Sequence, residues 1–308
     1  MDLRCQHFPL VFTLAAAAMT PAFAQAVAPT PIIARGENVE SSIPDFSGSW
    51  MHPLPGFEPL SSGPTALINR SRRANGTGDI LKLVGDYTNP ILKPQAVEIV
   101  KGHAELGLSG IGDPNPRNQC WPGGVPFVFT NGPTQLLQQP DKITILYGYD
   151  HQVRRVRLNQ PHPAEVVPSW YGDSVGRYEG DTLVVDTVGI KADRPFAMID
   201  LFGTPYTDKL HVVERYRLLS RDEVKGDIER AAKENWRPAG PMNPNYEDKY
   251  LQVHFTIEDE GTFTTPWTAT VIYLRDRGEW PEVACAENPA GFHHDKDADI
   301  PMAAKPDF

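Results

Sequence analysis

Basic residues, aromatic residues and cysteines are all scarce in this chain of 308 residues. Lysine and arginine number 29 against 39 aspartates and glutamates, which gives a net charge of -10. So acidic a chain is unsuited to nucleic acid or an anionic membrane surface, and we expect neither as a partner. Aromatic residues make up only 9%, whereas 30 prolines and 25 glycines indicate short elements joined by ordered loops rather than long helices.

Long hydrophobic runs are also missing. The longest apolar run, Phe8–Ala18, is too short to span a bilayer, so no membrane span is expected. It precedes the small-x-small sequence Ala22-Phe23-Ala24, as in a secretory signal peptide that is cleaved after Ala24. We therefore predict a periplasmic or secreted protein. Its expected parts are a signal peptide (1–24), a flexible leader (25–44) and a single β-rich domain (45–308) whose tail (288–308) is loosely ordered.

Cysteine usage fits an exported protein. After cleavage only Cys120 and Cys285 remain, and an oxidising compartment favours a disulfide between them, although two separately buried thiols are the alternative. The chain has no CxxCH haem site and no CxxC redox pair. It also has no P-loop and no GxGxxG sequence, so no cofactor is expected.

The stretch Trp170–Ile190 predicts the hairpin around which the fold is organised. Two strands, Val175–Glu179 and Thr182–Val188, flank the turn residues Gly180-Asp181. Further short runs rich in β-branched residues, separated by Asn, Gly, Pro and Asp, predict an antiparallel meander. These expected strands are 125–130, 134–138, 142–149, 152–158, 211–219, 250–257 and 267–275.

Together these elements predict a mainly β fold. We expect an antiparallel β-barrel or curled sheet with long Pro/Gly-rich loops and one or two short helices, at Lys93–Leu106 and Arg221–Trp236. Gly107 is expected to stop the first helix. The domain opens with Gly48-Ser49-Trp50, and a Gly-x-Trp in a first strand is similar to the start of lipocalin-like barrels, where the tryptophan closes the barrel floor.

Several phrases of the chain occur in an order typical of one protein family. The most specific is the hairpin phrase from Gly172 to Thr187, GDSVGRYEGDTLVVDT, preceded by Trp170. The chain resembles a large family of secreted bacterial proteins that share this motif, over roughly residues 46–285. Members commonly have tryptophan where this chain has Tyr178. The resemblance implies secretion and a β-rich fold, and it implies no particular activity.

The alternation of side chains along each strand predicts a functional site. Asp186 stands on a strand that is apolar on both faces, and a buried carboxylate must be paired or hydrogen-bonded. We expect ionisable groups to share a semi-polar barrel lumen, with Asp186, His151 and His211 as acid–base residues. The expected substrate-binding residues supply cations, a further imidazole and stacking rings: Arg155, His162, Trp170, Tyr178 and Arg215.

Other chemistry is less well supported by the sequence. Ser174 lies in a GxSxG sequence, but a nucleophile elbow needs a following helix and a hairpin is expected here. His151, His162 and His211 could together bind zinc, yet no HxH or HExxH spacing fixes two ligands, and we predict no metal. His293-His294 in the tail is expected to be solvated chain.

Two functions remain open from the sequence. One is a cofactor-free lyase, isomerase or dehydratase that uses His/Asp acid–base chemistry on a small hydrophobic or aromatic molecule. The other is a non-catalytic module that binds such a molecule or a partner protein, in which Arg–Asp pairs and histidines simply attach loops to the sheet. The oligomeric state is not predicted.

Overall fold

The computed structural model describes residues 43–52, 56–79, 81–109, 114–130, 132–234 and 246–276, together with 278, 280 and 282. The expected signal peptide, nearly all of the leader, the tail 288–308 and Cys285 lie outside these residues.

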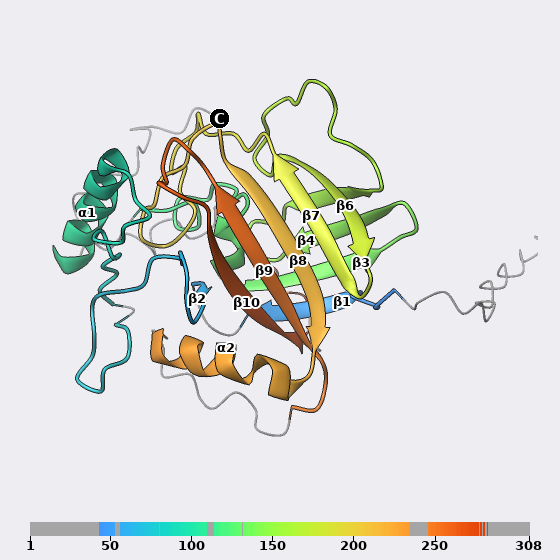
Figure 1. The fold of residues 1–308 in the computed structure, drawn as a ribbon, viewed down its shortest axis with the longest axis horizontal. Helices are drawn as coiled ribbons and strands as arrows, with labels where there is room; N and C mark the ends of the chain where they lie inside the picture. Colours follow the sequence, from blue (N-terminus) through green and yellow to red (C-terminus); the bar gives the residue numbers. More distant parts are fainter. Residues whose placement is uncertain are drawn as a thin grey trace, which may run out of the picture. The chain divides into compact units, whose positions relative to one another are not determined.

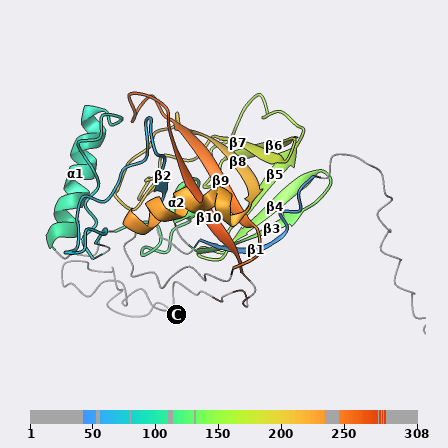
Figure 2. The same ribbon diagram turned by 60° about the horizontal axis from the view of Figure 1, so that its bottom comes forward.

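Within the described residues, nine strands close into a barrel (Figures 1 and 2). The barrel closes where β1 pairs with both β3 and β10. The mainly β barrel with few helices is thereby confirmed. In order around the barrel, the strands are β1 (Gly48–His52), β3 (Gly132–Gln138), β4 (Lys142–Tyr147), β5 (Val153–Leu158), β6 (Asp173–Glu179), β7 (Thr182–Val188), β8 (His211–Leu219), β9 (Tyr250–Glu258) and β10 (Trp267–Asp276), with a short β2 (Glu58–Pro59) beside β10.

One neighbouring pair in the barrel is parallel. β5 and β6 run in the same direction, with Val156 opposite Ser174, whereas the other strand pairs are antiparallel. The expected meander is therefore interrupted here, because residues 159–172 cross over instead of turning back. Parallel neighbours require such a long connection. This pair distinguishes the barrel from an up-and-down lipocalin barrel.

The predicted hairpin is confirmed as β6 and β7. Glu179 and Thr182 pair across the turn, and Gly180 takes the left-handed conformation (φ 62°), which glycine adopts without steric cost. The hairpin places Asp173, Val175 and Arg177 on one face of β6, and Ser174, Gly176 and Tyr178 on the other.

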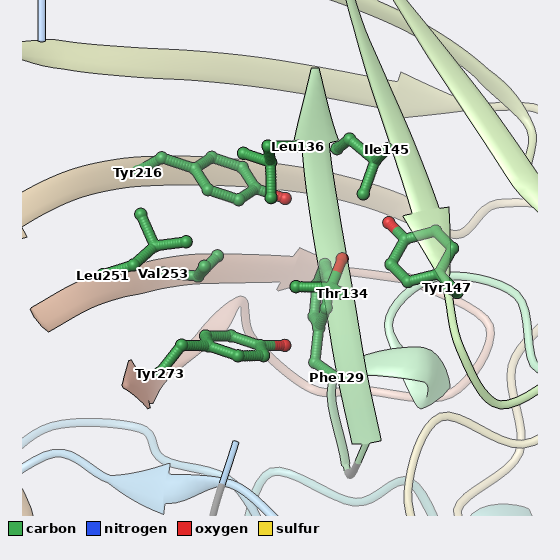
Figure 3. Close-up of a pocket in the computed structure, with 9 residues that line it drawn as sticks. All are labelled: Phe129, Thr134, Leu136, Ile145, Tyr147, Tyr216, Leu251, Val253 and Tyr273. Carbon is green, nitrogen blue, oxygen red and sulfur yellow. The ribbon is translucent and has the colours of Figure 1, made fainter. Parts of the chain in front are cut away.

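Apolar side chains fill the interior of the barrel. Trp50 is fully buried, as the Gly-x-Trp pattern predicts, and its indole N–H donates to the Phe46 carbonyl at 2.9 Å. One internal space, whose lining residues Figure 3 draws, offers about 10 Å³ to the centre of a water molecule, which is room for about one water. Its lining residues are Phe129, Thr134, Leu136, Ile145, Tyr147, Tyr216, Leu251, Val253 and Tyr273.

Two helices lie outside the strands. α1 (Pro94–Ser109) continues past Gly107, so the predicted stop is wrong. A side chain at Gly107 would contact the Leu83 carbonyl oxygen at 2.6 Å, and the glycine therefore serves close packing with a loop. α2 (Arg221–Glu234) packs over the outer face of β9 and β10 (Figure 2) through Val224 and Ile272. Neither helix is both long and apolar enough to cross a membrane, and nor is any other helix of the described residues.

One expected strand is absent. Residues 125–130 do not pair in the sheet; Phe127–Thr130 instead form a buried single turn of 3₁₀ helix. A short apolar run is compatible with a strand or with a buried turn, and Pro126 removes one backbone donor that a strand would use. The prediction of a strand there is wrong.

Candidate functional site

A row of alternating acidic and basic side chains crosses the outer face of the barrel, with Asp186 at its centre. The Asp186 Oδ1 atom accepts hydrogen bonds from His162 Nε2 at 3.1 Å and from His211 Nε2 at 3.0 Å. The other ring nitrogen of His162 lies 2.6 Å from Asp173 Oδ2, and that of His211 lies 3.3 Å from Glu258 Oε2. Two histidines thus converge on one carboxylate oxygen.

Arg157 extends the row on the side of β5. Its guanidinium donates two hydrogen bonds to the Asp173 carboxylate, at 2.6 and 2.9 Å. Bidentate arginine–carboxylate pairs are geometrically specific, so Asp173 is held in place. Asp173 in turn orients His162, which lies in the loop between β5 and β6. We call these six side chains the outer His–Asp row: Arg157, Asp173, His162, Asp186, His211 and Glu258.

The strand register explains why these side chains meet. Val156 lies opposite Ser174 and His211 opposite Glu258. Asp186 lies opposite Val175 and Val213, so its side chain shares the outer face with theirs. Successive side chains of a strand alternate between the faces of a sheet, and the row therefore collects one outward residue or more from each of β5 to β9.

The row lies at the edge of solvent. The Asp186 and His211 side chains are 30% and 31% exposed, and Glu258 is 51% exposed. The hydrogen bond from His211 lowers the pKa of Asp186, and the same bond raises the pKa of His211 above its ordinary value. The hydrogen bond from Arg157 lowers the pKa of Asp173. A neutral imidazole donates through one nitrogen only, so protonated His211 is the form that donates to both Asp186 and Glu258.

A second polar cluster lies inside the barrel, on the opposite face of the same strands. Arg154 and Glu214 are fully buried and form two hydrogen bonds of 2.6 and 3.0 Å. Burial alone would lower the pKa of Arg154, but Glu214 more than offsets it, so that pKa is raised well above the ordinary value. The remaining polar groups of this inner cluster are Ser174, Thr187, Tyr147 and Tyr216, which bond to Arg154 or Glu214.

The expected placement of the site in the lumen is therefore wrong, although the faces were assigned correctly. Arg155, Asp186 and His211 do share one face, but it is the outer one. The lumen holds the residues of opposite parity, Arg154 and Glu214. Alternation along a strand fixes which residues share a face. Only closure of the barrel decides which face is inside.

The structure brings together only some of the predicted site residues. Asp186, His211 and His162 are in contact. His151 lies exposed in the turn before β5, in a left-handed conformation (φ 53°), and no described contact joins it to Asp186 or His211. Arg155 is exposed on β5, and within the described residues no acid lies at ion-pair distance from it.

The other predicted substrate-binding residues lie away from the row. Arg215 is on the outer face of β8 but pairs with Glu179 at 2.7 Å. Tyr178 points to the inner face of β6, where its hydroxyl accepts a hydrogen bond from Gln138 at 2.7 Å. Trp170 precedes β6 and stacks on Trp121. Grouping these residues around one cleft with Asp186 is wrong, because Tyr178 faces the lumen, Trp170 lies before β6 and Arg215 is engaged by Glu179.

The sequence did not lead us to Asp173 and Glu258 as site residues, or to the role of Arg157 in holding Asp173. The signal was present in the alternation, since Asp173 lies two residues before Val175 and Glu258 two residues after Thr256, each on the outer face. Their proximity to His162 and His211 depended on the pairing of strands, which a single sequence does not give.

The remaining predictions concern single residues. Ser174 lies within β6 and accepts a hydrogen bond from Arg154 Nε at 2.9 Å. It does not lie at a strand-to-helix turn, which agrees with the prediction that it is no hydrolase nucleophile. Among the described residues no group of three or more His, Cys, Asp and Glu side chains is arranged to hold a metal ion. Cys285 and His293-His294 lie outside the described residues, so the Cys120–Cys285 disulfide stays a prediction.

Comparisons of the chain with family models, with curated proteins and with solved structures find no match. Membership of the family defined by the hairpin motif therefore stays a prediction, and the outer His–Asp row has to be interpreted from its own chemistry.

The row predicts a titration that can be measured. We expect His211 to titrate above 6.5 in the folded protein, and Asp186→Asn to bring its pKa back toward that value. The measurement is a ¹H–¹³C NMR titration of the histidine Cε1 protons. His254 is the internal control: burial lowers its pKa, and Asp186→Asn should leave it unchanged. An unchanged His211 titration in the variant would contradict the contact.

The same shifts give the pH range over which the row stabilises the fold. A raised histidine pKa contributes stability that is complete below 6.5 and is lost as the pH rises through the folded pKa of His211. The lowered pKa of Asp186 contributes stability that is present above 3.8 and is lost as the pH falls through its folded pKa. The contribution of the row is therefore greatest between these two ordinary values.

Proposed function

We propose that this chain is an exported, cofactor-free enzyme of the lyase, isomerase or dehydratase type, with its acid–base site in the outer His–Asp row. The observation that carries the proposal is the pair of histidines on Asp186 Oδ1, with His211 Nδ1 at the edge of solvent. Signal-directed export and the Cys120–Cys285 disulfide belong to the same proposal, because an oxidising compartment favours the bond.

In this proposal His211 is the proton-transfer residue and Asp186 its positioning residue. The Asp186 carboxylate holds the proton of His211 on Nε2, so the neutral imidazole carries its lone pair on Nδ1, beside Glu258, and acts there as a base. His211 Nδ1 takes a proton from carbon next to a substrate carbonyl, and the electron pair moves to the carbonyl oxygen as an enolate. The resulting imidazolium lies between Asp186 and Glu258, which both stabilise it.

The enolate has two outcomes. If the substrate has a double bond beside the deprotonated carbon, the enolate is a dienolate, and His211 returns the proton to the far carbon of that bond, which is an isomerisation. If the next carbon carries a leaving group, the enolate expels it and the His211 imidazolium gives its proton to that group, which is an elimination. Arg155 is the proposed cation for the enolate or for a substrate carboxylate. It is exposed on the same outer face as Asp173, and no described acid competes for it.

The test compares turnover by the exported protein and two variants on a panel of small aromatic and hydrophobic carbonyl compounds, with products followed by NMR. We expect His211→Gln to lower kcat by about 10²-fold or more, because general acid–base catalysis contributes on the order of 10²–10⁴. His151→Asn is the matched control, since asparagine tolerates the left-handed conformation of this exposed histidine. Equal turnover by wild type and His211→Gln would refute the assignment.

The second candidate is a non-catalytic binding or interaction module. One observation favours it: the internal space whose lining Figure 3 shows has room for about one water molecule, which is too little for an enclosed substrate. Under this alternative, the row attaches the loop around His162 to the sheet. It then predicts that His211→Gln lowers the stability of the fold, and that no compound of the panel is turned over by the wild-type protein.

A further inference from the structure

Two tryptophans form an exposed aromatic surface beside the hairpin. The Trp121 and Trp170 rings are stacked, with centroids 5.5 Å apart and planes 28° from parallel. Trp121 remains 38% exposed, so part of the pair is open to solvent. We call Trp121 and Trp170 the tryptophan pair. Large aromatic side chains usually bury most of their area, and an exposed stacked pair is a surface on which another ring can lie.

The backbone holds the tryptophan pair in place. Ser169 lies in a β-bridge with Ile190, and the Lys191 N–H donates to the Ser169 carbonyl at 2.8 Å, which fixes the segment that carries Trp170. Gly124 has a left-handed φ of 70°, and a side chain there would contact the Trp170 carbonyl oxygen at 2.6 Å. This close approach brings the loop with Trp121 against Trp170, so the surface is formed before any ligand arrives.

Two cations border the tryptophan pair. Arg194 lies 4.9 Å from the Trp170 ring centre and Lys191 Nζ lies 5.9 Å from it. The Arg194 guanidinium donates to the Pro122 and Gly123 carbonyls and to the Tyr206 hydroxyl, which are all neutral acceptors.

Neither cation has an acidic partner among the described residues. In the part of the chain that the structure describes, no carboxylate lies at ion-pair distance from Lys191 or Arg194. The nearby Asp150 is engaged by the Gly123 N–H and the Tyr171 hydroxyl. In a chain with a net charge of -10, two such cations beside an exposed aromatic pair favour an anionic ligand.

We propose that the tryptophan pair binds an aromatic carboxylate, with the ligand ring on the exposed part of Trp121 and its carboxylate paired with Lys191. The ring gains stacking and apolar burial from the indole, and the carboxylate gains a charge-assisted hydrogen bond. Arg194 adds positive potential while it holds the loop.

This proposal names the substrate class of the proposed function. Binding of an aromatic carboxylate does not depend on that function, but the claim that the bound molecule is the substrate does. Trp170 lies three residues before Asp173, and Lys191 follows Asp186 by five residues. The chain therefore links the tryptophan pair to the outer His–Asp row through the start of β6 and the end of β7.

The experiment measures binding without turnover, by tryptophan fluorescence and NMR, with three probes: benzoate, benzyl alcohol and acetate. Benzyl alcohol lacks the charge and acetate lacks the ring. We expect benzoate to bind about tenfold more tightly than either. Trp121→Ala should weaken benzoate binding about tenfold, Trp121→Phe less, and Lys191→Gln about fivefold. Lys209→Gln, which removes an exposed lysine elsewhere, should change nothing.

The outcomes separate this proposal from the proposed function. Benzoate binding that is no tighter than that of benzyl alcohol and acetate, or that is unchanged in folded Trp121→Ala and Trp121→Phe, would overturn the aromatic carboxylate site. His211→Gln should leave benzoate affinity unchanged, because His211 is not part of the tryptophan pair. Wild-type turnover by His211→Gln would refute the proposed function alone, and benzoate binding that folded Trp121→Ala leaves unchanged would refute the aromatic carboxylate site alone.

Discussion

Arg154→Met should lower the free energy of unfolding by about 3–5 kcal/mol, because it leaves the Glu214 carboxylate buried without its cation. Both side chains are almost wholly excluded from water, at 2% and 0% exposure, and they share two hydrogen bonds. Ser174 and Thr187 would also lose their arginine partner. Urea denaturation followed by tryptophan fluorescence measures the change.

Two further variants make this test specific. The double variant Arg154→Met, Glu214→Leu replaces the whole pair and should recover much of the lost stability, since exchanging both partners for apolar groups is far less costly than removing one. Arg177→Gln breaks an exposed ion pair with Glu179 and should leave stability nearly unchanged. A loss in Arg154→Met as small as that in Arg177→Gln would mean that Glu214 reaches water.

In a separate variant, Phe255→Ala should lower the free energy of unfolding by about 3–5 kcal/mol, because it opens a cavity in the barrel. Phe255 is fully buried on β9. Its ring centre lies 4.9 Å from that of Phe57, 5.5 Å from that of Phe129 and 6.3 Å from that of Trp267. Since these neighbours come from three separate segments, the cavity cannot collapse by the movement of one loop.

The same denaturation experiment measures this effect. Val167→Ala is the control, because Val167 is 80% exposed and its truncation should change the free energy of unfolding by less than about 0.5 kcal/mol. If Phe255→Ala were equally mild, the interior would be loosely packed. A loosely packed barrel could admit a substrate, and a site in the lumen would then be the better candidate.

The two polar clusters have different physical roles because of where they lie. The inner cluster around Arg154 is dry, so every group needs its partner and the cluster fixes one arrangement of β5, β6, β7 and β8. The outer His–Asp row is half-exposed, so each of its bonds contributes little to stability by itself. A row of low structural value that nevertheless shifts the pKa of His211 and Asp186 is suited to proton transfer.

Much of the fold was predictable from local sequence. The hairpin at Gly180, the opening strand with Trp50 and the two helices follow from turn chemistry, alternation and helix propensity, all of which act over a few residues. The strand predicted at 125–130 was wrong because the conformation there depends on contacts with residues far away in the sequence. A short apolar run has no period of its own, and its burial as a 3₁₀ turn depends on the residues packed around it.

The sequence by itself determined the two faces of each strand: Arg155 and His211 lie on the opposite face from Arg154 and Glu214 of the same strand. That information is carried by the two-residue period of a strand and needs no partner. Only the tertiary structure decided that the first group faces solvent and the second the lumen. It also decided that His162 meets Asp186 and that Trp121 meets Trp170. These contacts depend on the parallel β5–β6 crossover and on closure of β1 against β10, which join segments far apart in the chain.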